Sequence, residues 1–280
     1  MAPFLSLDQF YDKAWGHVWP HHEGRVSIAD IGLPINTDPD DVFNFPVQVD
    51  DHFDYTCYED LDAIYRLLHL KKSHASVLIV RPEYDLLRMA IESDSQFKNA
   101  FVVTGHPGIG KTIFLLYLLL YRLQRCLPTA VQFDDHRYFL FDEQGALARS
   151  VVDLDEPRIL QCWALADSNS NVSQPCLGFQ SDAKLVIQAS SPKPSTWKEW
   201  LKQAEGGRLY SELPTILEIA AILKEFCLDP SSTFPLVSRW GPSTRSIIDI
   251  VIAAACGRGW TVEEELEADA NGAAIQQRRF

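Results

Sequence analysis

The sequence predicts an α/β fold in three layers, with a mostly parallel sheet followed by a helical subdomain. Two observations lead to this class. Between residues 101 and 190, short apolar runs that end in polar residues recur, which is typical of buried parallel strands. From Ser195 onward the apolar residues recur at helical spacing instead. The 280 residues are enough for one large domain or two small ones.

The predicted boundaries follow these changes in pattern. We expect an N-terminal region over residues 1–75, a core over 76–205, a helical lid over 206–262 and a frayed tail over 263–280. The N-terminal region is rich in Asp, His, Pro and aromatic residues, and it contains one helix-like patch, YEDLDAIYRLLHLKK. We expect this region to pack against the core.

One stretch of the N-terminal region, HVWPHHEG, raises the question of a metal site. Its possible ligands are His17, His21, His22 and Glu23. No second ligand cluster follows in the sequence, and a loop around a proline that carries histidines is the commoner reason for such a pattern. We therefore expect a loop here.

The first elements of the core lead into a glycine-rich turn. RPEYDLLRMAIES has an early proline and then apolar residues at helical spacing, so a helix should begin near Arg81. In the following FVVTGHPGIGKTIFLLYLLL, an apolar strand ends at Thr104 and a helix opens after the turn. Between them lies G-x-x-x-x-G-K-T, which is a P-loop in this strand–loop–helix context. The motif consists of Gly105, His106, Pro107, Gly108, Ile109, Gly110, Lys111 and Thr112.

The residue types of this motif suit a bound phosphate chain. Glycines reach positive φ, so successive N–H groups can point into one concavity and bind an anion. The free N–H groups and the dipole of the next helix favour the β- and γ-phosphates of a nucleotide. Lys111 would neutralise these phosphates, and the Thr112 hydroxyl would bind a magnesium ion. The motif predicts phosphate binding and leaves the reaction open.

Beyond the P-loop helix, the pattern predicts further strands. The helix should run to about Cys126 and stop at Pro128, and TAVQF is typical of a short strand. Two extended runs in HRYFLFDEQGALARSVV flank a polar turn at residues 142–145, which predicts a hairpin. ILQCWALAD and AKLVIQASSP predict buried strands with polar residues at their carboxyl ends, the edge where open α/β sheets bind ligands.

Two aspartates compete for the role of the acid that supports the magnesium ion. Asp142 follows YFLF and precedes Glu143, so it matches the literal pattern of a hydrophobic run followed by Asp-Glu. Asp167 follows CWALA and precedes Ser168. We favour Asp167, because Asp142 falls in the predicted hairpin turn, whereas Asp167 ends a run typical of a buried strand beside the P-loop strand. If Asp142 is the acid instead, Glu143 becomes the candidate general base.

Two further groups are candidates for contact with the nucleotide. Ser190 or Ser191 could sense the γ-phosphate from the end of the adjacent strand, although a serine before a proline is also a common turn residue. In SRWGPSTRSIID, Gly-Pro-Ser predicts a helix start with Arg245 in its first turn, and Arg239 lies nearby. Arg245 could reach the nucleotide, and a surface arginine is the alternative.

Composition limits the other classes of function. The net charge of −13 argues against a general nucleic-acid-binding surface. The six cysteines form no C-x-x-C pair, which predicts buried thiols in a reducing compartment. The N-terminus lacks a basic start followed by a long apolar run, and the most apolar segment, residues 113–120, is too short to span a bilayer. We expect an intracellular protein, cytoplasmic or nuclear, without a membrane partner.

Taken together, these motifs resemble the P-loop ATPase module of the crinkler and retrotransposon-hot-spot (RHS) proteins, relatives of the AAA+ and STAND ATPases. The matching segments are GHPGIGKT, CWALADSN, LVIQASSP followed by TWKEWLK, and RWGPSTR, within about residues 76 to 250. The resemblance implies ATP and Mg2+ as cofactors, Asp167 as the magnesium-side acid, and Arg245 as a lid arginine. Ser168 stands where many ATPases have Glu, so no fast general base for water is visible.

We therefore expect a magnesium-dependent ATP-binding protein, a slow ATPase whose nucleotide state sets the position of its helical lid. Two alternatives stay open. A small-molecule or nucleoside kinase would place several arginines in one short lid segment, whereas the arginines here are separated. A nucleotide-stabilised scaffold without turnover is favoured by the missing Glu. A protein partner or self-association would fit a switch of this kind.

Overall fold

A computed structural model describes residues 5–31, 51–70, 77–169 and 172–257 of the chain. The chain divides into two compact units. Unit 1 contains Met1–Gly24 and Tyr55–Leu213, and unit 2 contains Arg25–Asp54 and Pro214–Phe280. The predicted tail at residues 263–280 lies outside the described residues.

Unit 1 is built around a seven-stranded sheet. In spatial order its strands are β10 (Gly207–Tyr210), β4 (Ala100–Thr104), β9 (Leu185–Ala189), β8 (Trp163–Asp167), β5 (Thr129–Gln132), β6 (Arg137–Asp142) and β7 (Gly145–Ser150). The strands from β10 to β5 pair in parallel, and β6 and β7 add to the β5 edge as an antiparallel hairpin. The mostly parallel sheet and the hairpin confirm the predictions from the sequence.

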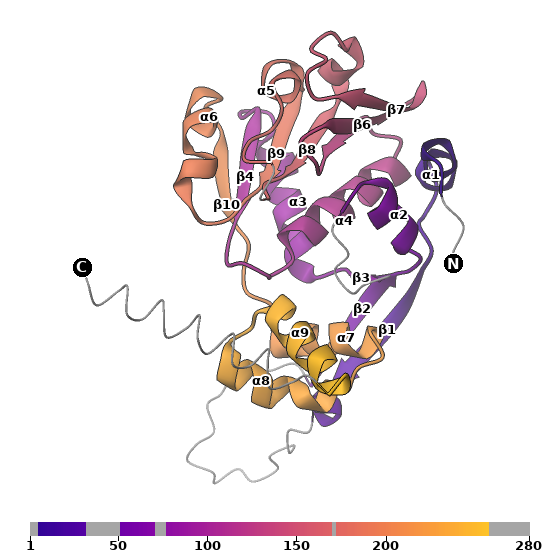
Figure 1. Cartoon of the computed structure of the whole chain (residues 1–280), viewed down its shortest axis with the longest axis vertical. Coiled ribbons are helices and arrows are strands. Elements are labelled where there is room, and N and C mark those ends of the chain that lie inside the picture. The colour runs from indigo at the N-terminus through magenta and orange to yellow at the C-terminus, as the bar shows by residue number, and fades with distance from the viewer. Residues whose placement is uncertain (1–4, 32–50, 71–76, 170–171, 258–280) are drawn as a thin grey trace, which may run out of the picture. The chain divides into compact units, whose positions relative to one another are not determined.

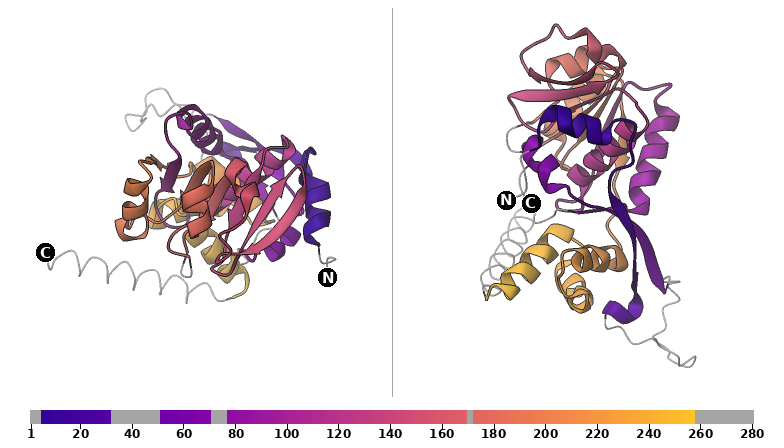
Figure 2. Two further views of the ribbon diagram at one scale, coloured as in Figure 1. Left: turned by 90° about the horizontal axis from the view of Figure 1, so that it is seen from above. Right: turned by 90° about the vertical axis from the view of Figure 1, so that its right-hand side faces the viewer.

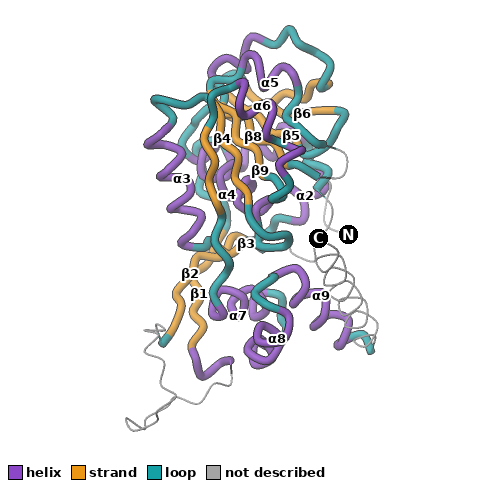
Figure 3. The backbone as a smooth tube through the Cα atoms, turned by 90° about the vertical axis from the view of Figure 1, so that its left-hand side faces the viewer, coloured by secondary structure: helices purple, strands orange, loops and turns teal. Residues whose placement is uncertain are grey.

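Helices cover both faces of this sheet, as Figure 3 shows. Because successive strand residues point to opposite faces, Val103 and Leu165 pack in one core, whereas Val102 and Ala164 pack in the other. The first core is completed by α3 (Pro82–Asp94) and α4 (Lys111–Gln124). The second is covered by α5 (Leu177–Asp182) and α6 (Lys198–Gln203). The predicted three-layer α/β fold is therefore present (Figure 1).

The helix α4 is the buried centre of the first core. Every residue from Phe114 to Leu120 is buried, so this helix is apolar nearly all round, as expected of a helix enclosed by a sheet and its neighbours. Its one buried charge, Arg122, donates to Thr129 Oγ1 at 2.9 Å and to the Pro128 carbonyl at 2.9 Å. These bonds tie the end of α4 to the start of β5.

The N-terminal residues pack on unit 1, as expected. Helix α1 (Leu7–Ala14) begins with a capping box in which Ser6 and Gln9 exchange hydrogen bonds. Its Phe10 ring packs edge-on against Phe141, and Tyr11 donates a hydrogen bond to the Asp142 carbonyl at 2.7 Å. Figure 2 shows α1 in indigo beside the hairpin strands. The predicted helix near residue 62 is also present, as α2 (Asp62–Leu67).

Only the first half of the histidine-rich stretch is the loop that the sequence predicts, because residues 17–20 form a bend and irregular structure and a strand follows. His21, His22 and Glu23 lie in a strand, within a small sheet of β1 (His21–Ser27), β2 (His52–Tyr58) and β3 (Leu78–Ile79). The alternation of exposed and half-buried residues along β1 is the period of two that a strand requires. Trp19 explains why the chain is ordered before this strand, because its indole donates to the Glu59 carbonyl at 2.7 Å.

Unit 2 is helical, as predicted for the residues after the core. It contains α7 (Ile216–Glu225), α8 (Thr233–Trp240) and α9 (Thr244–Ala255), with a core formed by Ile219, Leu223 and Ile247. Helix α9 begins directly after Ser243, as the Gly-Pro-Ser signal predicts. Unit 2 also takes in a short 3-10 helix at Ile28–Ile31, which the sequence alone grouped with the N-terminal region.

Two further expectations need correction. The sheet continues past residue 205, the predicted end of the core, because Gly207 pairs with Phe101 at the start of β10. Three of the cysteines are exposed instead of buried: Cys126, Cys227 and Cys256. Over the described ranges, no helix has both the length and the apolar character needed to cross a bilayer.

Candidate functional site

The glycine-rich motif forms the predicted strand, loop and helix. β4 ends at Thr104, and α4 begins at Lys111. Gly105, Gly108 and Gly110 have φ values of 154°, 77° and 101°, a region that residues with a Cβ rarely adopt. Together with the parallel strand order, this loop gives unit 1 a P-loop NTPase fold.

Close packing is a second reason for glycine at both ends of the loop. A Cβ on Gly105 would lie 2.8 Å from the Ser211 carbonyl oxygen, and one on Gly110 would lie 2.5 Å from the Tyr84 hydroxyl. Neither distance is tolerable for non-bonded atoms, so the loop keeps its path only with glycine at these positions.

Lys111 lies over the loop that it follows. Its Nζ donates to the Gly105 carbonyl at 2.8 Å and to the His106 carbonyl at 2.6 Å. An ammonium group held at the mouth of the loop adds a full positive charge to the partial charge of the N-terminus of α4. Both favour an anion at this end of the helix.

Thr112 and Asp167 meet at the start of α4. The Thr112 hydroxyl donates to Asp167 Oδ1 at 3.0 Å, and Asp167 is only 8% exposed. A hydroxyl and a carboxylate side by side offer the hard oxygen ligands that Mg2+ prefers. These two residues therefore fit a magnesium site beside a bound phosphate.

The strand order corrects one part of the argument for Asp167. The sequence places its strand beside the P-loop strand, but β9 lies between β8 and β4. Asp167 still reaches Thr112 because α4 crosses the sheet and contacts β5, β8 and β9. The strand directly beside β4 is β9, whose carboxyl end leads to Ser190.

Ser190 lies at the same edge of the sheet as Asp167. Its backbone N–H donates to the Val103 carbonyl at 2.9 Å, and its side chain is 1% exposed. The neighbouring Ser168 N–H donates to the Ala189 carbonyl at 2.8 Å, which holds the ends of β8 and β9 together. The position fits the expected role near the γ-phosphate, and that role stays a prediction.

Asp142 lies at the opposite edge of the sheet, the one formed by the amino ends of the parallel strands. β6 runs antiparallel to β5, and Phe141 near its end pairs with Thr129 at the start of β5. Asp142 is therefore level with the amino ends of the parallel strands, a strand length away from Asp167. This placement removes the literal Asp-Glu match from the P-loop, and Glu143 with it.

The Asp142 side chain holds the hairpin together. It accepts a hydrogen bond from the Gln144 N–H at 2.8 Å, and it forms a two-bond ion pair with Arg158, whose Nε lies 2.8 Å from Oδ2. The hydrogen bonds to the carboxylate raise the pKa of Arg158. Both groups are mostly buried, so this pair is structural.

Arg245 belongs to unit 2, where it lies in the first turn of α9. The expected start of this helix is confirmed, and the role of Arg245 as a lid arginine stays a prediction. Arg239 lies near the end of α8, with its guanidinium over the Trp240 ring at 4.8 Å.

Sequence reasoning missed the residues that support the loop from the side. Arg81, Glu83 and Tyr84 lie at the start of α3, and all three are buried. Arg81 donates to the Ile109 carbonyl at 3.1 Å. No local signal in the sequence identifies Arg81, because its hydrogen-bond partners lie 28 and 131 positions away along the chain.

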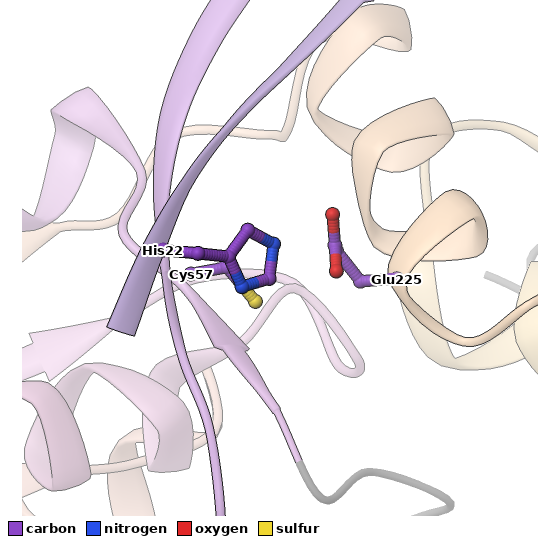
Figure 4. Close-up of side chains that lie close together, drawn as sticks. All are labelled: His22, Cys57 and Glu225. Atoms are coloured by element: carbon purple, nitrogen blue, oxygen red, sulfur yellow. The ribbon is translucent and has the colours of Figure 1, made fainter. Parts of the chain in front are cut away.

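The possible metal ligands that lie close together at the histidine-rich stretch are His22 on β1 and Cys57 on β2 (Figure 4). A ring nitrogen of His22 lies within 4.8 Å of the Cys57 sulfur, and Nδ1 is 2.6 Å from Glu59 Oε1. Glu225, also labelled there, belongs to unit 2 and is not counted with this pair. Two soft or borderline ligands are fewer than the four of a structural zinc site.

Comparisons with known proteins give little more. No family model matches the chain, and no curated protein does. Among solved structures, one variant of RuvB from Thermotoga maritima is similar at 15% identity and a TM-score of 0.36, covering 66% of this chain and 68% of that one. A second variant is similar at 16% identity and a TM-score of 0.35, covering 66% and 67%. At these values the similarity assigns no function to this chain.

Proposed function

We propose that this chain is a magnesium-dependent ATP-binding protein, a slow ATPase that acts as a nucleotide-dependent switch. The observation that carries the proposal is the contact of Thr112 with Asp167 at 3.0 Å, directly beside the loop that Lys111 covers. A hydroxyl, a carboxylate and an ammonium group at the mouth of a P-loop are the groups that a metal-bound triphosphate needs.

The phosphates would be held mainly by the backbone. The residues of 105–110 other than Pro107, which has no N–H, would present N–H groups to the β- and γ-phosphates, because the positive-φ glycines curve the chain around one point. Lys111 would exchange the Gly105 and His106 carbonyls for phosphate oxygens. A charged phosphate oxygen is the stronger acceptor, so the exchange favours binding.

Thr112 and Asp167 are the residues that would hold the magnesium ion. A magnesium ion bound there would supply positive charge that offsets the charge of the phosphates. Asp167, buried and already bonded to the Thr112 hydroxyl, would orient that hydroxyl.

Slow turnover is proposed because the residue after Asp167 is a serine. The Ser168 hydroxyl lies 3.4 Å from the Ser173 carbonyl, to which it donates, and a serine hydroxyl is a poor general base for water. The same observation favours the second candidate, a nucleotide-stabilised scaffold without turnover.

The order of the motifs supports membership of the crinkler and RHS ATPase modules. A partner protein, or a second copy of this chain, would then bind differently to the ATP-bound and ADP-bound states. The arginines of the kinase alternative would have to come from unit 2, where Arg239 and Arg245 lie on different helices.

A single-turnover assay with γ-labelled ATP and Mg2+ tests these functions. Release of inorganic phosphate at well below about 10 per second, the usual median for enzymes, is the expected result. Bound ATP that is recovered intact would favour the scaffold, and label in an added acceptor would favour a kinase. Absence of ATP binding in calorimetry would contradict the proposal as a whole.

A further inference from the structure

Arg81 connects the P-loop to the last residues of unit 1. The arginine is 2% exposed, and its Nη1 donates to the Ile109 carbonyl at 3.1 Å. Its Nη2 donates to the Glu212 carbonyl at 3.3 Å. One buried guanidinium therefore bridges the P-loop and a segment 103 residues further along the chain, the difference between positions 212 and 109.

Two neighbours of Arg81 repeat the connection. Glu83 Oε1 accepts a hydrogen bond from the Glu212 N–H at 2.9 Å. The Tyr84 hydroxyl donates to the Gly110 carbonyl at 3.2 Å. Thus the first turn of α3 binds two consecutive P-loop carbonyls on one side and both backbone polar groups of Glu212 on the other.

The segment after β10 also contacts the P-loop directly. The Ser211 N–H donates to the Thr104 carbonyl at 2.7 Å, which extends the pairing of β10 with β4. The Ser211 carbonyl oxygen lies against Gly105, at the position where a Cβ would approach to 2.8 Å. Both ends of the P-loop are therefore in contact with residues 211–212, either directly or through α3.

These contacts give a physical reason why the conformation of the P-loop is coupled to that of residues 211–212. A buried guanidinium that loses a hydrogen-bond partner has a large desolvation cost, so Arg81 cannot release Ile109 or Glu212 without a replacement. A change in the path of the loop at Ile109 must therefore be accommodated at Glu212. Unit 1 ends one residue later, at Leu213, and unit 2 begins at Pro214.

We propose that Arg81 and Glu83 are positioning residues that link nucleotide binding at the P-loop to the order of residues 211–212, where the chain leaves unit 1. The inference rests on the proposed nucleotide binding. It adds the route by which the P-loop and the connection to unit 2 affect each other, and linkage requires that the effect be reciprocal.

Hydrogen exchange of the nucleotide-free protein tests the contact between the start of α3 and Glu212 itself. The Glu212 amide is the reporter, because its N–H is bonded to Glu83. Glu83→Ala removes the acceptor and should speed exchange of this amide by about tenfold, the scale of one hydrogen bond to a charged group. Glu83→Gln keeps an acceptor oxygen and should largely restore protection. Equal protection in wild type and Glu83→Ala would contradict the contact between Glu83 and Glu212.

Exchange with and without ATP and Mg2+ tests the linkage. Wild type should show slower exchange over residues 209–216 when ATP is bound. Arg81→Met, which keeps much of the side-chain volume but has no donors, should lose that difference and bind ATP about tenfold more weakly. Arg81→Lys keeps the charge but cannot fork onto two carbonyls, so it should also lose the difference. An ATP-dependent difference that survives in both variants would overturn the proposal.

Arg122→Met is the matched control. Arg122 is another buried arginine of unit 1, and it bonds to Thr129 and Pro128 instead of the P-loop. Its replacement should lower the melting temperature while the ATP-dependent exchange difference stays at the wild-type value. Loss of the difference in Arg122→Met as well would mean that general destabilisation causes it, which would overturn the linkage. If wild type binds no ATP, the proposed function and the linkage both fail. The nucleotide-free experiment still tests the contact between the start of α3 and Glu212.

Discussion

Asp142 and Asp167 end two strands of the same sheet, and both are almost fully buried, with exposed fractions of 4% and 8%. Asp142 is paired with Arg158 and caps a turn. Asp167 accepts a hydrogen bond from Thr112 at the start of the P-loop helix. The difference lies in strand direction. β8 runs parallel to the P-loop strand β4, with β9 between them, whereas β6 runs antiparallel to β5 and therefore to all of these strands.

The comparison teaches that an apolar run followed by an aspartate does not define an active-site acid. The run has to end at the edge of the sheet where the P-loop lies, and only parallel strands bring their carboxyl ends there. The string YFLFDE fails this condition, although its residues match the literal pattern better. Each of the following variants tests whether the two edges of the sheet have separate roles.

The largest effect is expected from Lys111→Ala at the P-loop edge. ATP affinity should fall by about a hundredfold or more, because the variant removes the charge aimed at the phosphates. Calorimetry measures the affinity. Lys98→Ala, which removes a lysine paired with Asp94 on the surface of α3, is the control and should bind ATP normally. Unchanged affinity in Lys111→Ala would remove the nucleotide from this loop.

Asp142→Asn should act on stability alone. It leaves Arg158 beside a neutral amide, so the free energy of unfolding should fall by about 2 kcal/mol, the scale of hydrogen bonds to a charged group. Denaturant unfolding measures this change, and ATP affinity should not move. Glu143→Gln, in the same turn, should change neither quantity.

A thiol near the hairpin offers a second readout for Asp142→Asn. Burial, with a further contribution from the Asp142 charge, raises the pKa of Cys162 to about 12. At pH 8 this thiol therefore stays protonated, and it should react with iodoacetamide far more slowly than exposed Cys126. Removing the Asp142 charge should lower the Cys162 pKa and speed its labelling. A labelling rate equal to that of wild type would contradict the contribution of the Asp142 charge to the Cys162 pKa.

Asp167→Asn should act on magnesium-dependent binding alone. The amide keeps an oxygen near Thr112 but loses the charge that supports the ion, so Mg2+ should strengthen ATP binding about tenfold less than in wild type. Titrations with and without Mg2+ measure this ratio. If Asp142→Asn shows the magnesium effect and Asp167→Asn only a lower melting temperature, the assignment of the two edges is wrong.

The smallest effect is expected from Arg245→Ala in unit 2. An arginine that contacts the γ-phosphate should favour ATP over ADP, and its loss should weaken ATP by about threefold, the scale of one solvent-screened charge contact. Competition titrations with both nucleotides measure the ratio. Equal losses for ATP and ADP would make Arg245 an ordinary surface residue.

Several features could be predicted from the sequence because their causes are local. The P-loop is specified by contiguous residues, in which glycines set the backbone path and Lys111 follows directly. The hairpin is specified by its turn, and α9 by the Gly-Pro-Ser signal before it. In each case the residues that decide the structure lie within a few positions of one another.

The tertiary structure decided the features that depend on distant partners. A strand's sequence does not encode which strand pairs with it, so β9 could enter between β4 and β8 and β6 could turn its Asp142 to the far edge. Arg81 has partners 28 and 131 positions away, so no local pattern identifies it as a support of the P-loop. Sequence by itself determined where phosphate should bind, because that depends on backbone conformation within one loop. Which acid and which arginine lie beside that loop was decided by the folded chain, since strand order and direction bring Asp167 to Thr112, and packing of α3 brings Arg81 to Ile109.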